Sequence, residues 1–264
     1  MAAGRALGAE AQVNPNRPTR AITAESVPAG MAQIEVGMPY QRDASGDRPV
    51  RRLAPNALLR FGLFENLEAS AGTFFLRERS EGQGTSGLGD TTLAAKWHFL
   101  DDEAWRPALA VQPFVKLPTA SRGKSLGSGR ADFGATLAAG KGLPGNLTIL
   151  PNLTLVGVSQ SDGSSGLFLQ RVVAFPIFWG VTDRLTAFWE IFYQSRDRPA
   201  GRHGVGTDFG LALLLHRRVM ADVAGEFRLA GATPDWVVRG GLSVLLGPVL
   251  GEGPGRPVPP SGRP

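Results

Sequence analysis

The chain has 264 residues, including 35 glycines and 20 prolines, and charged residues make up only 19% of it. Glycines and prolines interrupt nearly every stretch that could form a helix, so long helices are not expected. The longest unbroken apolar stretch, Val172 to Val181, has ten residues, whereas a membrane-spanning helix needs about 18–20. The composition therefore excludes a helical membrane protein.

The charges and the reactive side chains exclude several further classes of protein. The chain carries 28 Lys and Arg against 23 Asp and Glu without a basic block, so a nucleic-acid partner is not expected. The absence of cysteine excludes disulfides, thiolate metal sites and cysteine nucleophiles. The three histidines, His98, His203 and His216, are not spaced to share a metal. With no nucleotide loop or catalytic motif, the sequence predicts no metal site, no cofactor and no enzymatic activity.

The two ends differ in composition from the middle of the chain. Ala9-Glu10-Ala11 has the small-residue pattern of a signal-peptide cleavage site, so residues 1–30 are expected to be a signal-peptide remnant followed by a periplasmic N-terminal segment. A plain disordered tail is the alternative for the first eleven residues. Residues 248–264 are rich in proline and glycine, and we expect them to be disordered.

The region between the ends, 31–247, consists of short runs that alternate apolar and polar residues. Such period-2 alternation is typical of strands with two different faces. In the run from Leu185 to Gln194, for example, Leu, Ala, Trp, Ile and Tyr share one face. Residues 167–179 fit neither phase, so their faces are not assigned. Twelve strands are predicted, at 31–42, 53–63, 67–78, 88–99, 105–117, 129–140, 147–159, 167–179, 184–195, 204–216, 219–230 and 235–246.

The connections between these strands alternate between short and long. Short turns with long loops at the other end are typical of outer-membrane barrels, as is an even number of strands. A sheet in hydrocarbon must close, because the bilayer core tolerates no unpaired sheet edge. Several aromatic residues lie near predicted strand ends, as in an interfacial girdle. The predicted fold is a transmembrane antiparallel up-and-down β-barrel of about 12 strands; a soluble periplasmic β-sandwich or lipocalin-like binding protein is the alternative.

The charged face of the strands is expected to point into the barrel, because charges of both signs are costly toward lipid. There they would line an aqueous pore, or pair across the lumen and close it, which would make the barrel mainly structural. The predicted lumen-lining residues are Glu35, Arg60, Glu68, Asp90, Lys96, Lys116, Arg130, Asp132, Glu190, Asp208, Glu226, Arg228 and Arg239.

The predicted outer loops are mostly basic. Such a mouth attracts anions or binds the phosphates of lipopolysaccharide, and it predicts a weak preference for anions; the alternative is that these charges are simply solvated. The charged residues of these loops are Arg122, Lys124, Arg196, Arg198, Arg202 and His203, with Asp197 as the opposing acid.

Several short segments, in a characteristic order, resemble the "meta-pathway of phenol degradation" family of outer-membrane proteins. They are 22–30, with Val27-Pro28-Ala29-Gly30, then 33–37, 55–68, 87–96, 117–121 and 180–185. The stretch Ala24-Glu25-Ser26 departs from the family pattern.

The resemblance implies an outer-membrane barrel that acts as a transporter, associated in some members with uptake of aromatic compounds. The sequence thus predicts a passive channel or transporter for small compounds, including aromatic or hydrophobic ones, in the outer membrane of a Gram-negative bacterium. Its expected partners are outer-membrane lipid, lipopolysaccharide and a small-molecule solute.

Overall fold

The computed structural model describes residues 11–44, 49–121, 124, 126–159 and 167–249. The predicted cleavage site and C-terminal tail lie almost entirely outside these residues. Within the described ranges, no helix is long and apolar enough to cross a membrane.

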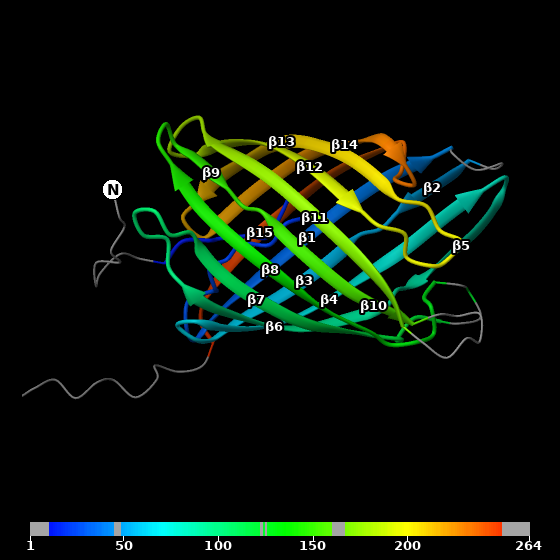
Figure 1. Cartoon of the computed structure of the whole chain (residues 1–264), viewed down its shortest axis with the longest axis horizontal. Coiled ribbons are helices and arrows are strands. Elements are labelled where there is room, and N and C mark those ends of the chain that lie inside the picture. The colour runs from blue at the N-terminus through cyan, green and yellow to red at the C-terminus, as the bar shows by residue number, and fades with distance from the viewer. Residues whose placement is uncertain (1–10, 45–48, 122–123, 125, 160–166, 250–264) are drawn as a thin grey trace, which may run out of the picture.

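All the regular structure belongs to one antiparallel sheet (Figure 1). Its elements are β1 (Met31–Asp43), β2 (Val50–Leu53), β3 (Asn56–Phe64), β4 (Leu67–Ser80), β5 (Gln83–Leu88), β6 (Thr91–Leu100), β7 (Ala108–Leu117), β8 (Asp132–Leu143), β9 (Leu147–Ile149), β10 (Asn152–Ser159), β11 (Leu167–Gly180), β12 (Leu185–Gln194), β13 (Gly204–His216), β14 (Val219–Gly231) and β15 (Trp236–Pro248). The pairs β2 and β3, β5 and β6, and β9 and β10 are each one strand of the wall with a short interruption.

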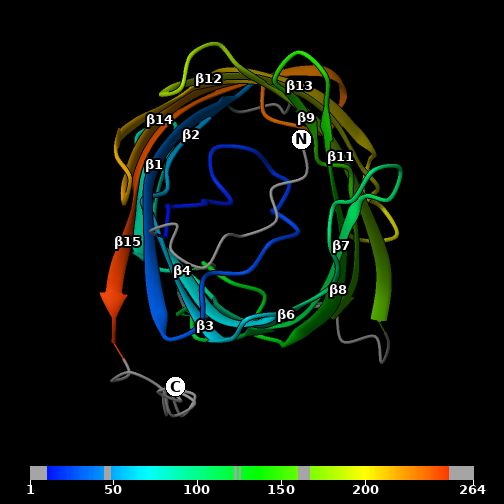
Figure 2. The same ribbon diagram turned by 90° about the vertical axis from the view of Figure 1, so that its left-hand side faces the viewer.

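The sheet closes on itself because the first strand pairs with the last. β1 and β15 are antiparallel partners from Ala32 and Leu246 to Arg42 and Trp236, and the result is a 12-stranded barrel (Figure 2). Closure pairs the backbone of each edge strand, which is the condition for a sheet to survive in hydrocarbon. The predicted fold class is confirmed.

Alternate residues on each strand face different environments. In β12, Glu190 and Phe192 are buried, whereas their neighbours Trp189 and Ile191 are 45% and 38% exposed. The outer surface is therefore largely apolar, as a lipid-facing surface must be. The structure also assigns the faces of β11, which the pattern left open: Val173 points outward and Ala174 inward.

One hairpin is longer than the sequence predicted. β4 continues to Ser80 and β5 begins at Gln83, so most of the loop expected after residue 78 is strand. The turn consists of Glu81 and Gly82, both with positive φ, as in the hairpin turns whose twist matches the flanking strands. The sequence did not predict this extension because the end of β4 is charged and shows no apolar alternation. A strand that extends beyond the bilayer no longer needs an apolar face.

Aromatic residues mark both ends of the outer surface. Tyr40 and Trp236 contact each other at one end, with ring centroids 5.6 Å apart, and Trp97 and Phe99 do so at the other end, at 5.4 Å. These pairs have the position of the interfacial girdles of membrane barrels. Phe178, which also lies near the end of a predicted strand, instead contacts the buried Phe188.

Candidate functional site: the barrel lumen

Residues 11–30 lie inside the barrel and cross its interior (Figure 2). This N-terminal segment has no regular secondary structure over most of its length. Val13, Ala21, Ala24 and Val27 of the segment are nevertheless at most 3% exposed, because the wall surrounds them. The lumen is thus partly filled by the chain's own N-terminal region.

One network of fully buried charges lies on β1, β3, β4 and β6. Arg60 is fully buried; its Nε donates to Glu68 Oε1 at 2.8 Å and its Nη1 to Glu35 Oε1 at 2.9 Å. Lys96 adds a second cation, with Nζ 3.4 Å from Glu68 Oε2. Buried charges are tolerated when they are paired and hydrogen-bonded in this way.

The N-terminal segment completes this network through its backbone. The backbone N–H of Val27 donates to Glu68 Oε2 at 2.9 Å, and Lys96 Nζ donates to the carbonyl of Glu25 at 2.6 Å. The buried guanidinium on β3 donates to the carbonyl of Asn14 at 2.7 Å. The wall charges therefore satisfy polar backbone groups of an irregular segment, which would otherwise be unpaired.

A second network holds the segment against β12, β13, β14 and β15. Arg20 Nη2 donates to Glu226 Oε1 at 2.6 Å, and the Arg20 backbone N–H donates to Glu190 Oε2 at 3.0 Å. Arg239 donates from Nη1 to Glu226 Oε2 at 2.9 Å and also pairs with Asp208. Cations of the segment and of the wall thus share the same carboxylates.

Arg17 lies flat against the inner wall. Its Nε and Nη2 donate to Asp222 Oδ2 and Oδ1 at 3.1 and 3.0 Å, a bidentate pair. A Cβ atom at Gly37 or Gly241 would collide with this guanidinium. The close approach of the arginine therefore requires glycine at both wall positions.

Carboxylates outnumber cations among the ionisable side chains that the wall strands turn toward the segment. The carboxylates are Glu35, Glu68, Asp90, Asp132, Glu190, Asp208, Asp222 and Glu226, and the cations are Arg60, Lys96, Lys116 and Arg239. The segment supplies Arg17, Arg20 and several backbone N–H donors to this acidic wall. Segment and wall are complementary in charge.

The structure brings together most of the side chains predicted to line the lumen. Those buried inside the barrel are Glu35, Arg60, Glu68, Asp90, Lys96, Asp132, Glu190, Asp208 and Glu226. Lys116 and Arg239 are partly exposed, and Lys116 Nζ lies 3.3 Å from Asp90 and 2.5 Å from Asp132.

Two of the predicted lumen residues lie outside the buried networks. Arg228 keeps the inward phase of Glu226 but is near the end of β14, where it pairs with Asp43 and Asp235. Arg130 is exposed in the connection before β8, because that strand begins only at Asp132 and its alternation does not extend back to residue 130.

Sequence reasoning missed the partners that the N-terminal segment contributes. Arg17 and Arg20 lie in a polar, proline-containing run that was interpreted as a periplasmic segment. Asn152, whose Oδ1 accepts the Ile22 backbone N–H at 2.9 Å, was also missed. A usable signal was present: the inward faces carry surplus carboxylates, and a closed barrel must pair them.

Two cavities remain in the lumen, and the first of them adjoins the segment. One, of about 260 Å³, is bordered by Arg17, Arg20 and Gln112. The Oε1 of Gln112 is buried and has no hydrogen-bond partner among the described residues. The other, of about 340 Å³, is bordered by Asp90 and Lys116. Both cavities are small; the first is lined mostly by polar side chains, and the second by polar and apolar side chains together.

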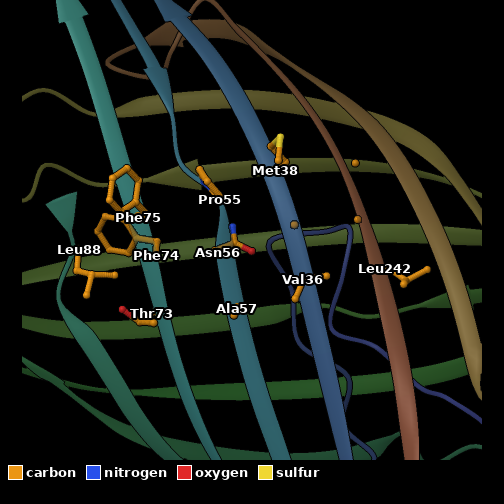
Figure 3. A pocket seen from close by; sticks show the side chains of 13 residues that line it. Val36, Met38, Pro55, Asn56, Ala57, Thr73, Phe74, Phe75, Leu88 and Leu242 are labelled. Atoms are coloured by element: carbon orange, nitrogen blue, oxygen red, sulfur yellow. The ribbon is translucent and has the colours of Figure 1, made fainter. Parts of the chain in front are cut away.

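An apolar hollow of about 560 Å³ lies at the wall where β1, β3, β4 and β15 run side by side (Figure 3). Exposed side chains such as Met38, Phe75 and Leu88 line it, and Asn56 and Phe74 border both this hollow and the 340 Å³ cavity. The wall is irregular here because it contains two prolines at this level, residues 39 and 55, which cannot donate to the hydrogen-bond ladder. The outer hollow and the lumen are thus separated by a thin part of the wall.

No group of three or more metal-ligating side chains occurs among the residues that the structure describes. His98 instead helps to hold the segment, with Nδ1 3.1 Å from the Ala24 carbonyl and Nε2 2.7 Å from Asp101 Oδ1.

Comparisons with known proteins agree with this architecture. An outer-membrane channel from Pseudomonas putida F1 superposes with a TM-score of 0.70 at 15% identity, covering 89% of this chain and all of that one. The porin NanC superposes with a TM-score of 0.55 at 10% identity, covering 80% of this chain and 98% of that one. At such identities the likeness shows the fold alone, that of an outer-membrane barrel.

The search of curated proteins found no match. The model of the family described as "Putative MetA-pathway of phenol degradation" matches residues 15–246, which include most of the N-terminal segment and nearly the whole barrel. The chain therefore belongs to this family of outer-membrane β-barrels.

Proposed function

We propose that this protein is a passive channel of the bacterial outer membrane for small compounds, and that its buried charged residues line the path. The observation that carries the proposal is the charged lumen, in which two cavities remain, one of them beside the N-terminal segment. A barrel of twelve strands encloses more space than its wall side chains can fill. Paired charges and a free acceptor at Gln112 offer hydrogen bonds to a polar group in transit.

The dimensions of these cavities favour small solutes. Volumes of about 260 and 340 Å³ lie at the low end of the usual range for small-molecule sites. Larger solutes require the segment to shift, and its many hydrogen bonds oppose such a movement.

The apolar hollow supports the proposal that aromatic or hydrophobic compounds are among the solutes. Its lining by Met38, Phe75 and Leu88 suits an apolar ring, and it adjoins the inner cavity through Asn56 and Phe74. A compound with an apolar body and one polar group matches the two surfaces better than a sugar does.

We also propose that the barrel contacts lipopolysaccharide at its extracellular end, where the loop at 196–203 is rich in arginine.

Permeation by the refolded protein in liposomes tests the channel. We expect conductance above that of the bare lipid, and faster entry of a small monoaromatic alcohol than of a disaccharide. A folded barrel, identified by its altered gel migration before boiling, that passes neither ions nor solutes would support the alternative of a structural barrel with a closed lumen. A protein that stays monomeric and soluble in plain buffer would point instead to a periplasmic binding protein.

A further inference from the structure

A basic hollow of about 350 Å³ lies at the ends of β11, β12 and β13 that border the loop at 195–203. Its lining residues are Phe168, Leu169, Arg171, Ser195, Arg196 and His203. This basic hollow is separate from the lumen networks and shares none of their side chains.

Arg171 faces outward from the barrel. Its side chain is on the same face of β11 as those of Leu169 and Val173, which are 45% and 43% exposed. Arg171 is itself exposed. Its backbone N–H donates to Ser195 Oγ at 2.8 Å, and the Ser195 N–H donates to its carbonyl at 2.7 Å, which places it level with the end of β12. A lipid-facing arginine is costly at the bilayer midplane and tolerated near the interface, so this position marks the headgroup level.

Two further basic side chains border the same hollow. The guanidinium carbon of Arg196 lies 5.4 Å from the Phe168 ring centroid. His203 stacks on Tyr193, and its Nδ1 lies 2.7 Å from the tyrosine hydroxyl. These contacts hold the two side chains at the edge of the hollow.

None of the ion pairs formed by the described residues involves Arg171, Arg196 or His203. By contrast, Arg228, which also lies near the end of its strand, pairs with Asp43 and Asp235. The two exposed arginines, gathered without a carboxylate and next to apolar residues, are available to bind an anion from outside the chain.

We propose, building on the lipopolysaccharide contact of the proposed function, that the basic hollow binds a phosphate group of an outer-leaflet glycolipid. Arg171 and Arg196 donate to the phosphate oxygens, a geometry that guanidinium groups favour. The acyl chains lie below it along the outward side chains Val173 and Phe175. The apolar row directly beneath the cations is the reason to choose a lipid over free phosphate, which would leave that row without a partner.

Native mass spectrometry of the detergent-solubilised protein with bisphosphorylated lipid A tests this proposal. We expect one retained lipid on the natural chain and at least tenfold less retention on the double variant Arg171→Gln and Arg196→Gln. Arg198→Gln is the matched control, since it removes a charge from the same loop but does not border the hollow. Lipid A without its phosphates should be retained poorly by every variant.

The gel shift on boiling shows that each variant is folded. Arg171→Lys, which keeps the charge and loses the bidentate geometry, should retain an intermediate amount of lipid. Equal retention by the double variant would overturn the proposal, as would an equal loss in Arg198→Gln, which would indicate diffuse attraction to the loop. Equal binding of dephosphorylated lipid A by the natural chain would overturn it without any variant. Displacement of the lipid by millimolar inorganic phosphate would show a simple anion site instead.

Discussion

The charged side chains of the lumen are mostly buried and paired, whereas those of the basic hollow are exposed and form no ion pair among the described residues. In the lumen, Arg60 is fully buried and contacts two carboxylates and a backbone carbonyl. In the basic hollow, Arg171 and Arg196 are exposed and belong to no ion pair of the described residues. In the lumen, the N-terminal segment and the wall supply the hydrogen-bond and ion-pair partners of these charges. The basic hollow is open to a partner.

This difference separates charges that affect stability from charges that affect binding. Removing one partner of a buried ion pair lowers the free energy of unfolding, because the remaining charge stays desolvated. Exposed charges contribute little to folding, so they are available for recognition. Changes in the two regions should therefore separate cleanly into effects on folding and effects on binding.

The largest effect on stability is expected from Arg60→Met. It leaves Glu35 and Glu68 buried without this cation, and removing one partner of a buried pair costs about 3–5 kcal/mol. Urea unfolding in lipid vesicles measures the change. Arg106→Met, in an exposed pair with Glu103, is the control and should cost less than about 1 kcal/mol. Equal losses of unfolding free energy in the two variants would mean that the buried lumen network contributes no more to stability than an exposed ion pair does.

The lipid-facing surface should respond to charge according to depth. Leu211 is in the middle of β13 and 45% exposed, and Leu215 is near its end. Leu211→Arg should cost about 2–4 kcal/mol and Leu215→Arg at most about 1 kcal/mol. The same unfolding measurement applies. Equal costs at the two positions would argue against a bilayer spanning this face.

Loss of the arginines of the N-terminal segment should change conduction more than stability. Arg17→Ala with Arg20→Ala leaves Asp222 and Glu226 without these cations. We expect at least a twofold rise in conductance and a reversal potential shifted toward cations, because the exposed wall is acidic. Planar-bilayer recording checks both. Arg198→Ala in the outer loop should leave the conductance unchanged.

A cross-link tests whether that rise comes from movement of the segment. Ala24 and Ala108 pack together inside the barrel, and the natural chain has no cysteine. The double variant Ala24→Cys and Ala108→Cys can therefore form only the engineered disulfide. Oxidation should suppress most of the conductance gained by the arginine variant, and reduction should restore it. A gain that persists after oxidation would mean that loss of charge alone widens the path.

The smallest effect is expected at the short-turn end of the barrel. Partial burial acts to raise the pKa of Asp102, but hydrogen bonds from Lys141 Nζ at 2.5 Å and the Gly142 N–H at 2.9 Å lower the pKa overall. A lowered pKa stabilises the fold above the unfolded value of about 4 and loses this contribution as pH falls through that range. Asp102→Asn should cost less than about 1 kcal/mol at pH 7. The difference from the natural chain should shrink below pH 4; a constant difference would contradict the assignment.

Much of the barrel could be predicted because the alternation of apolar and polar residues along a strand is visible within a few neighbouring residues. Alternation along β12 separates Glu190 from Trp189 and Ile191, and it requires only the period of a strand. The faces of β11 could not be predicted, since apolar residues lie on both sides of it and Ala174 packs against Ala21 and Phe192. The extension of β4 was missed because its charged end lies beyond the apolar band.

The sequence by itself determined the strands, their alternating faces, the need for closure and the class of side chain inside the barrel. Only the tertiary structure decided which charges meet, because residues such as Arg20 and Glu226 are 206 positions apart and no local period connects them. It also decided where the N-terminal segment lies. An irregular polar run carries no strand signal, and its place in the lumen follows from carboxylates that the closed barrel collects from strands far apart in the sequence.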